Sequence, residues 1–132
     1  MSKNIILSNQ EIQHKTKRIA YQIYETFIDE QEIVLAGIAS NGFIFAQKIA
    51  SELESISSLK ILLCEVKVDK QNPEQPITTS LTCEQCKDKG LILIDDVLNS
   101  GTTLIYAVRH FLDVPLKKFK TAVLVDRNHK KY

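Results

Sequence analysis

The sequence lacks any long hydrophobic run. Its apolar stretches are broken by polar residues within about ten positions, whereas roughly twenty apolar residues in a row are needed to cross a bilayer. The first apolar run, Ile5, Ile6 and Leu7, is also too short for the hydrophobic region of a secretion signal. We therefore expect a soluble protein with no membrane partner.

Cysteine is scarce as well. The three cysteines, Cys64, Cys83 and Cys86, are an odd number in a chain without a visible leader, which is typical of a reducing compartment, and we expect a cytoplasmic protein. Cys83 and Cys86 have the CxxC spacing of half a zinc site or of a redox pair. No second CxxC and no histidine at a matching spacing accompanies them, so we interpret this stretch as a loop carrying two thiols. A redox pair would need a helix that begins at Cys83.

Neither sign of charge dominates. The 17 Lys and Arg residues against 16 Asp and Glu residues give a net charge of +1, which excludes inferring nucleic-acid binding from composition alone. The 132 residues are 44% hydrophobic and 25% charged, close to the averages of globular proteins. They contain no repeat and no linker. We therefore expect a single domain over residues 1–132.

Hydrophobic periodicity predicts an alternation of helices and strands. Residues 8–27 have helical spacing, and Ser8 and Glu11 stand at the spacing of a capping box. Short continuous apolar runs predict strands that are buried on both faces. The expected elements are a helix over 8–27, a strand over 33–38, a helix after Gly42, a strand over 60–68, a long polar loop over 69–89, a strand over 90–94, a helix after Gly101 that runs through Leu112, and a strand over 121–125. This order predicts a three-layer α/β fold with a mostly parallel sheet.

The most informative stretch is residues 91–103, LILIDDVLNSGTT. It places two acids, a glycine-containing turn and a helix start at the carboxyl end of a buried strand, where open α/β sheets bind their ligands. The backbone N–H groups of the turn and the positive end of the helix dipole suit a phosphate group. Asp95 and Asp96 would repel a lone phosphate but suit sugar hydroxyls or a bound Mg²⁺, so a phosphorylated sugar fits both parts. The plainer interpretation is that Asp95 caps the strand and Ser100 caps the helix.

The run LILIDDVLNSGTT resembles the phosphoribosyl pyrophosphate (PRPP) motif of the type I phosphoribosyltransferases. The similarity extends over most of the chain and is greatest to the pyrimidine-operon attenuation regulators that also act as uracil phosphoribosyltransferases. Residues 33–42 resemble their first strand and pyrophosphate loop, and TAVLVDRNH at 121–129 resembles the strand and turn after their PRPP helix.

The resemblance implies a Mg²⁺-dependent transfer of ribose 5-phosphate from PRPP to a nucleobase, a pyrimidine and specifically uracil. It implies that Asp95 and Asp96 are catalytic, contacting the ribose hydroxyls and the metal shell. Asp126 and Arg127 are expected near the base. The pyrophosphate would lie on Ala39, Ser40, Asn41 and Gly42, and the 5-phosphate on Asn99, Ser100, Gly101, Thr102 and Thr103. We also expect a homo-oligomer.

Some positions differ from the family pattern. The regulators usually have cations where this chain has Ala39, Asn41 and Thr102, and the long loop over 69–89 lacks their Tyr-Arg-Asp-Asp type of flap sequence. No hood segment is visible before Tyr132, so either the domain is C-terminally incomplete or base recognition is absent or comes from elsewhere. These differences keep a second hypothesis open, an RNA-binding or sensing regulator of pyrimidine genes with a weak or inactive catalytic site. A local basic excess supports that alternative. Residues 114–132 hold a single acid, Asp126, against Lys117, Lys118, Lys120, Arg127, Lys130 and Lys131.

Two further interpretations of the same residues are less well supported. A response-regulator-like receiver also uses clustered acids on an α/β sheet, but those acids ordinarily follow the first strand, and here they follow the third expected strand. A nucleotide-binding P-loop is not supported, because the sequence has no GxxxxGK[ST] run.

Overall fold

The computed structural model describes residues 9–39, 41–69, 71–72, 76–98 and 102–126. The chain order of the elements is α1 (Asn9–Thr26), β1 (Glu32–Ile38), α2 (Asn41–Ile56), β2 (Lys60–Lys67), β3 (Thr78–Thr79), α3 (Cys83–Cys86), β4 (Gly90–Leu98), α4 (Thr102–Phe111) and β5 (Lys118–Asp126). No helix among the described residues is long and apolar enough to cross a membrane.

The five strands form one sheet in the order β3-β2-β1-β4-β5. β1 lies at the centre and pairs in parallel with β2 on one side and with β4 on the other. β5 adds a parallel edge strand, and the two-residue β3 pairs antiparallel with the end of β2. The expected mostly parallel sheet is therefore confirmed.

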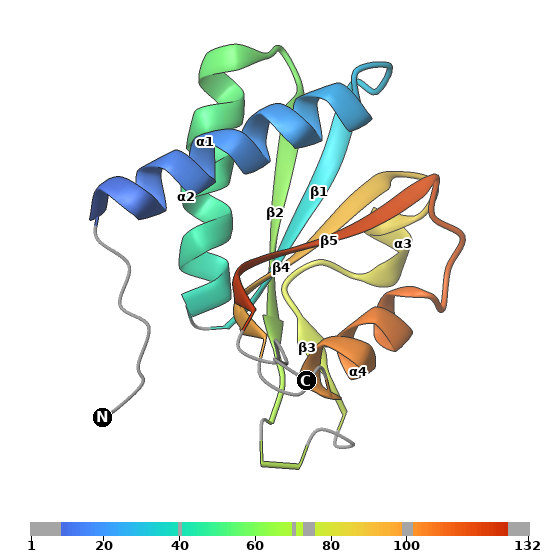
Figure 1. Ribbon diagram of the computed structural model, residues 1–132. Helices are drawn as coiled ribbons and strands as arrows, with labels where there is room; N and C mark the ends of the chain where they lie inside the picture. The colour runs from blue at the N-terminus through green and yellow to red at the C-terminus, as the bar shows by residue number, and fades with distance from the viewer. Residues whose placement is uncertain (1–8, 40, 70, 73–75, 99–101, 127–132) are drawn as a thin grey trace, which may run out of the picture.

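Helices cover both faces of this sheet, so the fold has three layers (Figure 1). α1 and α2 pack on one face, where Phe27, Phe45 and Leu53 meet alternate residues of β1 and β4 such as Leu35 and Ile92. α3 and α4 pack on the other face through Cys86, Ala107 and Phe111. Both faces of β1 and β4 are thus buried, which is why their sequences are continuously apolar. Each fully buried large apolar side chain stabilises the fold by roughly 1.5–3 kcal/mol.

Several boundaries differ from the sequence-based expectations. β4 does not end at the two acids but continues to Leu98, because β5 goes on pairing with it as far as Leu98 and Asp126. β5 begins at Lys118, three residues before the expected start at Thr121. Ser8, the expected cap of the first helix, lies outside the described residues.

The segment over 69–89 is more ordered than the expected loop. It contains β3, which is fixed to β2 because the Ser80 N–H donates to the Glu65 carbonyl (3.0 Å) and the Glu65 N–H donates to the Ser80 hydroxyl oxygen (2.8 Å). It also contains α3, a single helical turn over the two cysteines that we expected in a loop. The CxxC therefore begins a helix after all.

Candidate functional site

The candidate site lies where β1 ends beside β4, at the lower edge of the sheet in Figure 1. From β1 the chain enters α2 on one face of the sheet and goes on to β2, whereas from β4 it reaches α4 on the opposite face and goes on to β5. The connections leave these two neighbours in opposite directions. Parallel sheets bind ligands at such a topological switch point, outside the carboxyl ends of the strands.

Gly37, the penultimate residue of β1, lets α2 begin very close to the strand. A Cβ atom built on Gly37 would lie 2.6 Å from the Gly42 carbonyl oxygen and 2.8 Å from the Phe43 backbone nitrogen. These are backbone atoms, so no side-chain rotation would relieve the overlap. Only glycine at this position allows the first turn of α2 to pack on the end of β1.

Gly42 makes the corresponding approach to β4. A Cβ atom there would lie 2.9 Å from the Ile94 carbonyl oxygen, 3.1 Å from the Asp95 Cα and 3.4 Å from the Asp95 Oδ1. The backbone of α2 at Gly42 is therefore in direct contact with β4 at its acidic residue. Two stretches that are separated by about fifty residues, both predicted to bind parts of one ligand, meet at this point.

Asp95 directly follows Ile94, the last residue of β4 that pairs with β1. The register pairs Gly37 with Ile94, and after that β4 pairs only with β5, where Asp95 faces Val123. The first turn of α2 lies against β4 at this point through Gly42. As a result Asp95 is only 3% exposed, one of two buried polar residues among the described part of the chain. A nearly buried carboxylate within a strand is costly unless its surroundings or a ligand offer it positive charge or hydrogen-bond donors.

The predicted pyrophosphate segment is partly helix and partly connection. Ala39 is half-buried, and its N–H donates to the Val66 carbonyl (2.7 Å), which directs the chain toward the end of β2. Asn41 is exposed and Gly42 is buried, and they are the first two residues of α2 rather than part of a loop. Ser40 lies outside the described residues.

The predicted 5-phosphate segment leads from β4 into α4. α4 begins at Thr102, close after the end of β4, as the motif requires, and Thr103 is half-buried in its first turn. Asn99, Ser100 and Gly101 lie outside the described residues, as do the side chains of Thr102 and Asp96. The helix start is thus where the sequence placed it, while the phosphate contacts themselves stay a prediction.

The predicted base-binding pair follows the end of the edge strand. Asp126 is the last residue of β5 and pairs with Leu98, so its backbone lies at the same edge of the sheet as Asp95. Its side chain and Arg127 lie outside the described residues.

No cluster of three or more His, Cys, Asp or Glu side chains that could bind a metal occurs within the described ranges. A hollow of about 330 Å³ lies between α1 and β5, but none of the residues that line it is a predicted site residue.

Sequence reasoning missed Gly37. The signal was present, because a glycine inside an otherwise apolar strand pattern indicates a close backbone approach.

Comparisons with known proteins agree with this geometry. The model of the phosphoribosyl transferase domain matches residues 2–132. The bifunctional protein PyrR of Pediococcus pentosaceus is 35% identical over 123 residues, which cover 86% of this chain and 70% of that protein. PyrR of Clostridium botulinum is 32% identical over 136 residues, which cover 97% of this chain and 76% of that protein.

Solved structures show the same fold. The hypoxanthine-guanine phosphoribosyltransferase of Bacillus anthracis superposes with a TM-score of 0.76 at 22% identity, covering 96% of this chain and 73% of that chain. A hypoxanthine phosphoribosyltransferase of Staphylococcus aureus gives 0.76 at 16% identity, covering 98% of this chain and 73% of that chain. Because the domain model matches residues 2–132 of the chain and PyrR proteins are similar across most of both sequences, this chain belongs to the type I phosphoribosyltransferase family.

Proposed function

We propose that the chain binds PRPP together with Mg²⁺ across the ends of β1 and β4, and transfers ribose 5-phosphate to a pyrimidine base, uracil, with release of pyrophosphate. The observation that supports this most is the contact between Gly42 and Asp95. It joins the segment proposed for the pyrophosphate to the residue proposed for the ribose. One ligand that carries a phosphate at each end of a sugar would span the two segments.

The proposed reaction needs electrostatic stabilisation more than a covalent nucleophile. Displacement at the anomeric carbon places positive charge on the sugar and negative charge on the departing pyrophosphate. The Asp95 carboxylate, held on β4 with little exposure, would stabilise the positive sugar and accept hydrogen bonds from its hydroxyls. Backbone N–H groups at the starts of α2 and α4 would bind the phosphates at the two ends of the ligand.

The residues present fit Mg²⁺ in a particular way. Mg²⁺ keeps much of its water and is usually bound through one or two carboxylates together with substrate phosphates. One buried carboxylate at the switch point, with Asp96 next to it in the sequence, matches that donor set without any cage of protein ligands in the described ranges. Asp95 and Asp96 would hold the ion through its water shell. The ion would supply charge neutralisation for the leaving pyrophosphate.

The test is calorimetric titration with PRPP and Mg²⁺ of the parent chain and of the double variant Asp95→Asn, Asp96→Asn. Hydrogen bonds to charged groups contribute about 1.5–3 kcal/mol, so we expect the double variant to bind PRPP at least about tenfold more weakly. Asp113→Asn, an exposed acid beyond the end of α4, is the matched control and should leave the affinity unchanged. An unchanged affinity in the folded double variant would remove the role proposed for the pair.

A second candidate function is RNA binding, and a specific surface favours it. His14, Lys17, Arg18 and Tyr21 stand at helical spacings of three and four on α1, and all four are exposed. A basic helix face with an aromatic residue suits the phosphates and bases of single-stranded RNA. Two of the lysines near the C-terminus have partners within the chain. Lys117 pairs with Glu30 (3.1 Å), and Lys118 donates to the Thr26 carbonyl (2.8 Å).

Binding of an RNA hairpin at graded salt concentrations tests this second function. Replacing Lys17 and Arg18 by glutamine should weaken binding and reduce the salt slope by about one for each phosphate that the variant no longer neutralises. Replacing Lys87, an exposed lysine after α3, by glutamine serves as the control. Equal salt slopes in all three proteins would exclude this helix face.

A further inference from the structure

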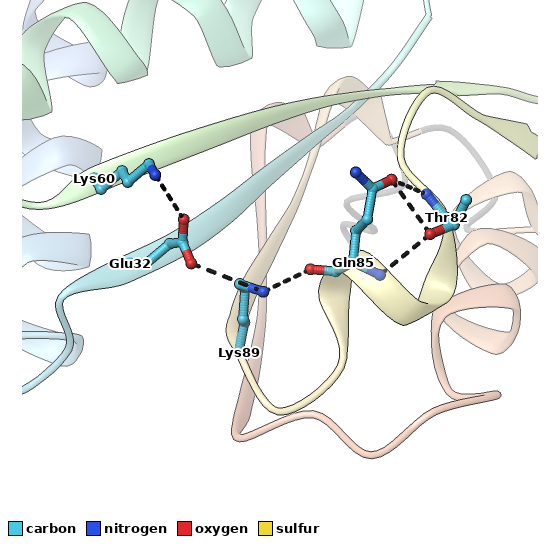
Figure 2. Close-up of polar contacts among 5 residues, drawn as sticks. All are labelled: Glu32, Lys60, Thr82, Gln85 and Lys89. Atoms are coloured by element: carbon cyan, nitrogen blue, oxygen red, sulfur yellow. Dashed lines mark hydrogen bonds and ion pairs between the residues drawn. The ribbon is translucent and has the colours of Figure 1, made fainter.

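The segment Cys83-Glu84-Gln85-Cys86 is a closed helical turn, and the proposed reaction uses neither of its two cysteines. Thr82 is the N-cap of α3 and forms a capping box with Gln85 (Figure 2). The Gln85 N–H donates to the Thr82 hydroxyl oxygen (3.2 Å), and the Thr82 N–H donates to the Gln85 side-chain oxygen (2.8 Å). Such reciprocal bonds fix the start of a helix.

The end of the turn is fixed as well. The Lys89 ammonium donates to the Gln85 carbonyl (2.8 Å) and lies 3.8 Å from a carboxylate oxygen of Glu32, whose other oxygen is 3.7 Å from the Lys60 ammonium (Figure 2). Glu32 and Lys60 begin β1 and β2, and Lys89 directly precedes β4. α3 is therefore attached to the edge of the sheet opposite the candidate site.

The two cysteines stand three residues apart in this turn. Three residues along an α-helix separate two Cα atoms by roughly 5 Å, as its rise and radius require. That separation lies within the Cα range of disulfides. The turn is reached from solvent, since Thr82, Glu84 and Gln85 are exposed, whereas Cys86 is fully buried against β2 and β4. The side chain of Cys83 itself lies outside the described residues. A turn whose neighbouring residues are exposed, with its second cysteine packed in the core, suits a dithiol in which the first cysteine reacts and the second resolves.

We propose that Cys83 and Cys86 form a reversible dithiol–disulfide pair, with a small-molecule disulfide such as glutathione disulfide as the oxidant. The Cys83 thiolate attacks one sulfur of that disulfide, which forms a mixed disulfide and expels one thiolate. The Cys86 thiolate then attacks the Cys83 sulfur and expels the second. Two protein thiols are oxidised, one external disulfide is reduced to two thiols, and the two protons lost by the protein thiols end on the two expelled thiolates.

The competing pairing is between Cys86 and Cys64. Cys64 is also fully buried and belongs to the same apolar cluster, on β2. It is on a different element from Cys86, however, and both thiols would have to meet the oxidant inside the core. The order of the steps proposed here needs access only at the turn.

The folded 132-residue chain is incubated in buffers with graded ratios of reduced to oxidised glutathione. The reaction is quenched with acid, the remaining thiols are alkylated, and the peptides are mapped by mass without reduction. We expect the peptide that holds residues 83–86 to lose the mass of two hydrogens as the buffer becomes more oxidising, and the glutathione ratio at which half of it is oxidised is the midpoint. Cys64 should stay reduced until the chain is unfolded. Cys83→Ser should abolish this loss. Cys64→Ala should leave it intact.

A further variant tests whether α3 itself presents the pair. Thr82→Ala removes the capping box, and since an N-cap contributes about a factor of five to helix stability, the midpoint should shift about fivefold toward more oxidising ratios. The proposal is overturned if the folded chain keeps residues 83 and 86 reduced at every ratio at which the unfolded chain oxidises them. It is equally overturned if the bond found joins Cys64, or if Thr82→Ala leaves the midpoint where it was.

Discussion

Replacing Gly42 by alanine tests the contact on which the proposed site depends. The new Cβ would lie 2.9 Å from the Ile94 carbonyl oxygen and 3.1 Å from the Asp95 Cα. Both are backbone atoms of a central strand, so neither can rotate away. The first turn of α2 must therefore shift away from β4 by several tenths of an ångström.

The expected size follows from two opposing effects. Overpacking of a tight contact costs about 1–3 kcal/mol, while alanine stabilises a helix by up to about 1 kcal/mol relative to glycine. We therefore expect the free energy of unfolding to fall by about 0.5–2 kcal/mol. The same shift separates the two parts of the site, and a loss of about 1.4 kcal/mol in binding corresponds to tenfold weaker affinity for PRPP.

Urea unfolding and calorimetric titration measure the two effects separately. Gly90→Ala is the matched control, because its Cβ would meet the Phe27 ring at the opposite end of β4. That variant should lose stability and keep its affinity for PRPP. If Gly42→Ala loses stability without losing affinity, or loses neither, the contact between α2 and β4 does not organise the site.

Other positions give smaller, independent tests. Asp88 has a positive φ of 62°, which glycine adopts easily and a β-branched residue does not. In urea unfolding, Asp88→Gly should leave the free energy of unfolding unchanged or raise it by up to about 1 kcal/mol, and Asp88→Val should lower it by about 1–2 kcal/mol. The reverse order would contradict the backbone geometry. Phe111 is 1% exposed beneath the sheet, and Phe111→Ala should lower the free energy of unfolding by about 3–5 kcal/mol in the same assay. A loss below about 1 kcal/mol would mean that α4 does not pack on the sheet at this residue. Glu32→Gln removes two partly exposed ion pairs and should lower the free energy of unfolding by less than about 1 kcal/mol, with a smaller loss at high salt. A loss that salt does not change would mean that the ion pairs are not its source.

The layered fold was predictable because its strongest signals are local. The continuous apolar runs of β1 and β4 indicated strands buried on both faces, and the spacing of apolar residues indicated α1, α2 and α4. The parallel order followed from the alternation of strands and helices.

The length of β4 was not predictable in the same way. Asp95 and Asp96 interrupt its apolar run, and a periodicity argument ends the strand there. The strand continues because β5 offers hydrogen bonds beyond the acids, with Val97 opposite Val125. Pairing with a distant strand overrides the local pattern.

The missed helix α3 has a different cause. Its sequence, Thr82-Cys-Glu-Gln85, has the capping-box spacing, but a four-residue turn has no apolar periodicity to support that signal. The two prolines of the same segment also favoured a loop. The candidate site was predicted in its residues, while the glycine contacts that bring them together depend on tertiary packing.

The most direct test of the central claim is a competition titration of the intact chain with PRPP, ribose 5-phosphate and pyrophosphate in the presence of Mg²⁺. If one sugar phosphate spans the ends of β1 and β4, PRPP should bind more tightly than either fragment and each fragment should displace it. Failure of PRPP to bind, or binding that neither fragment competes with, would contradict the account.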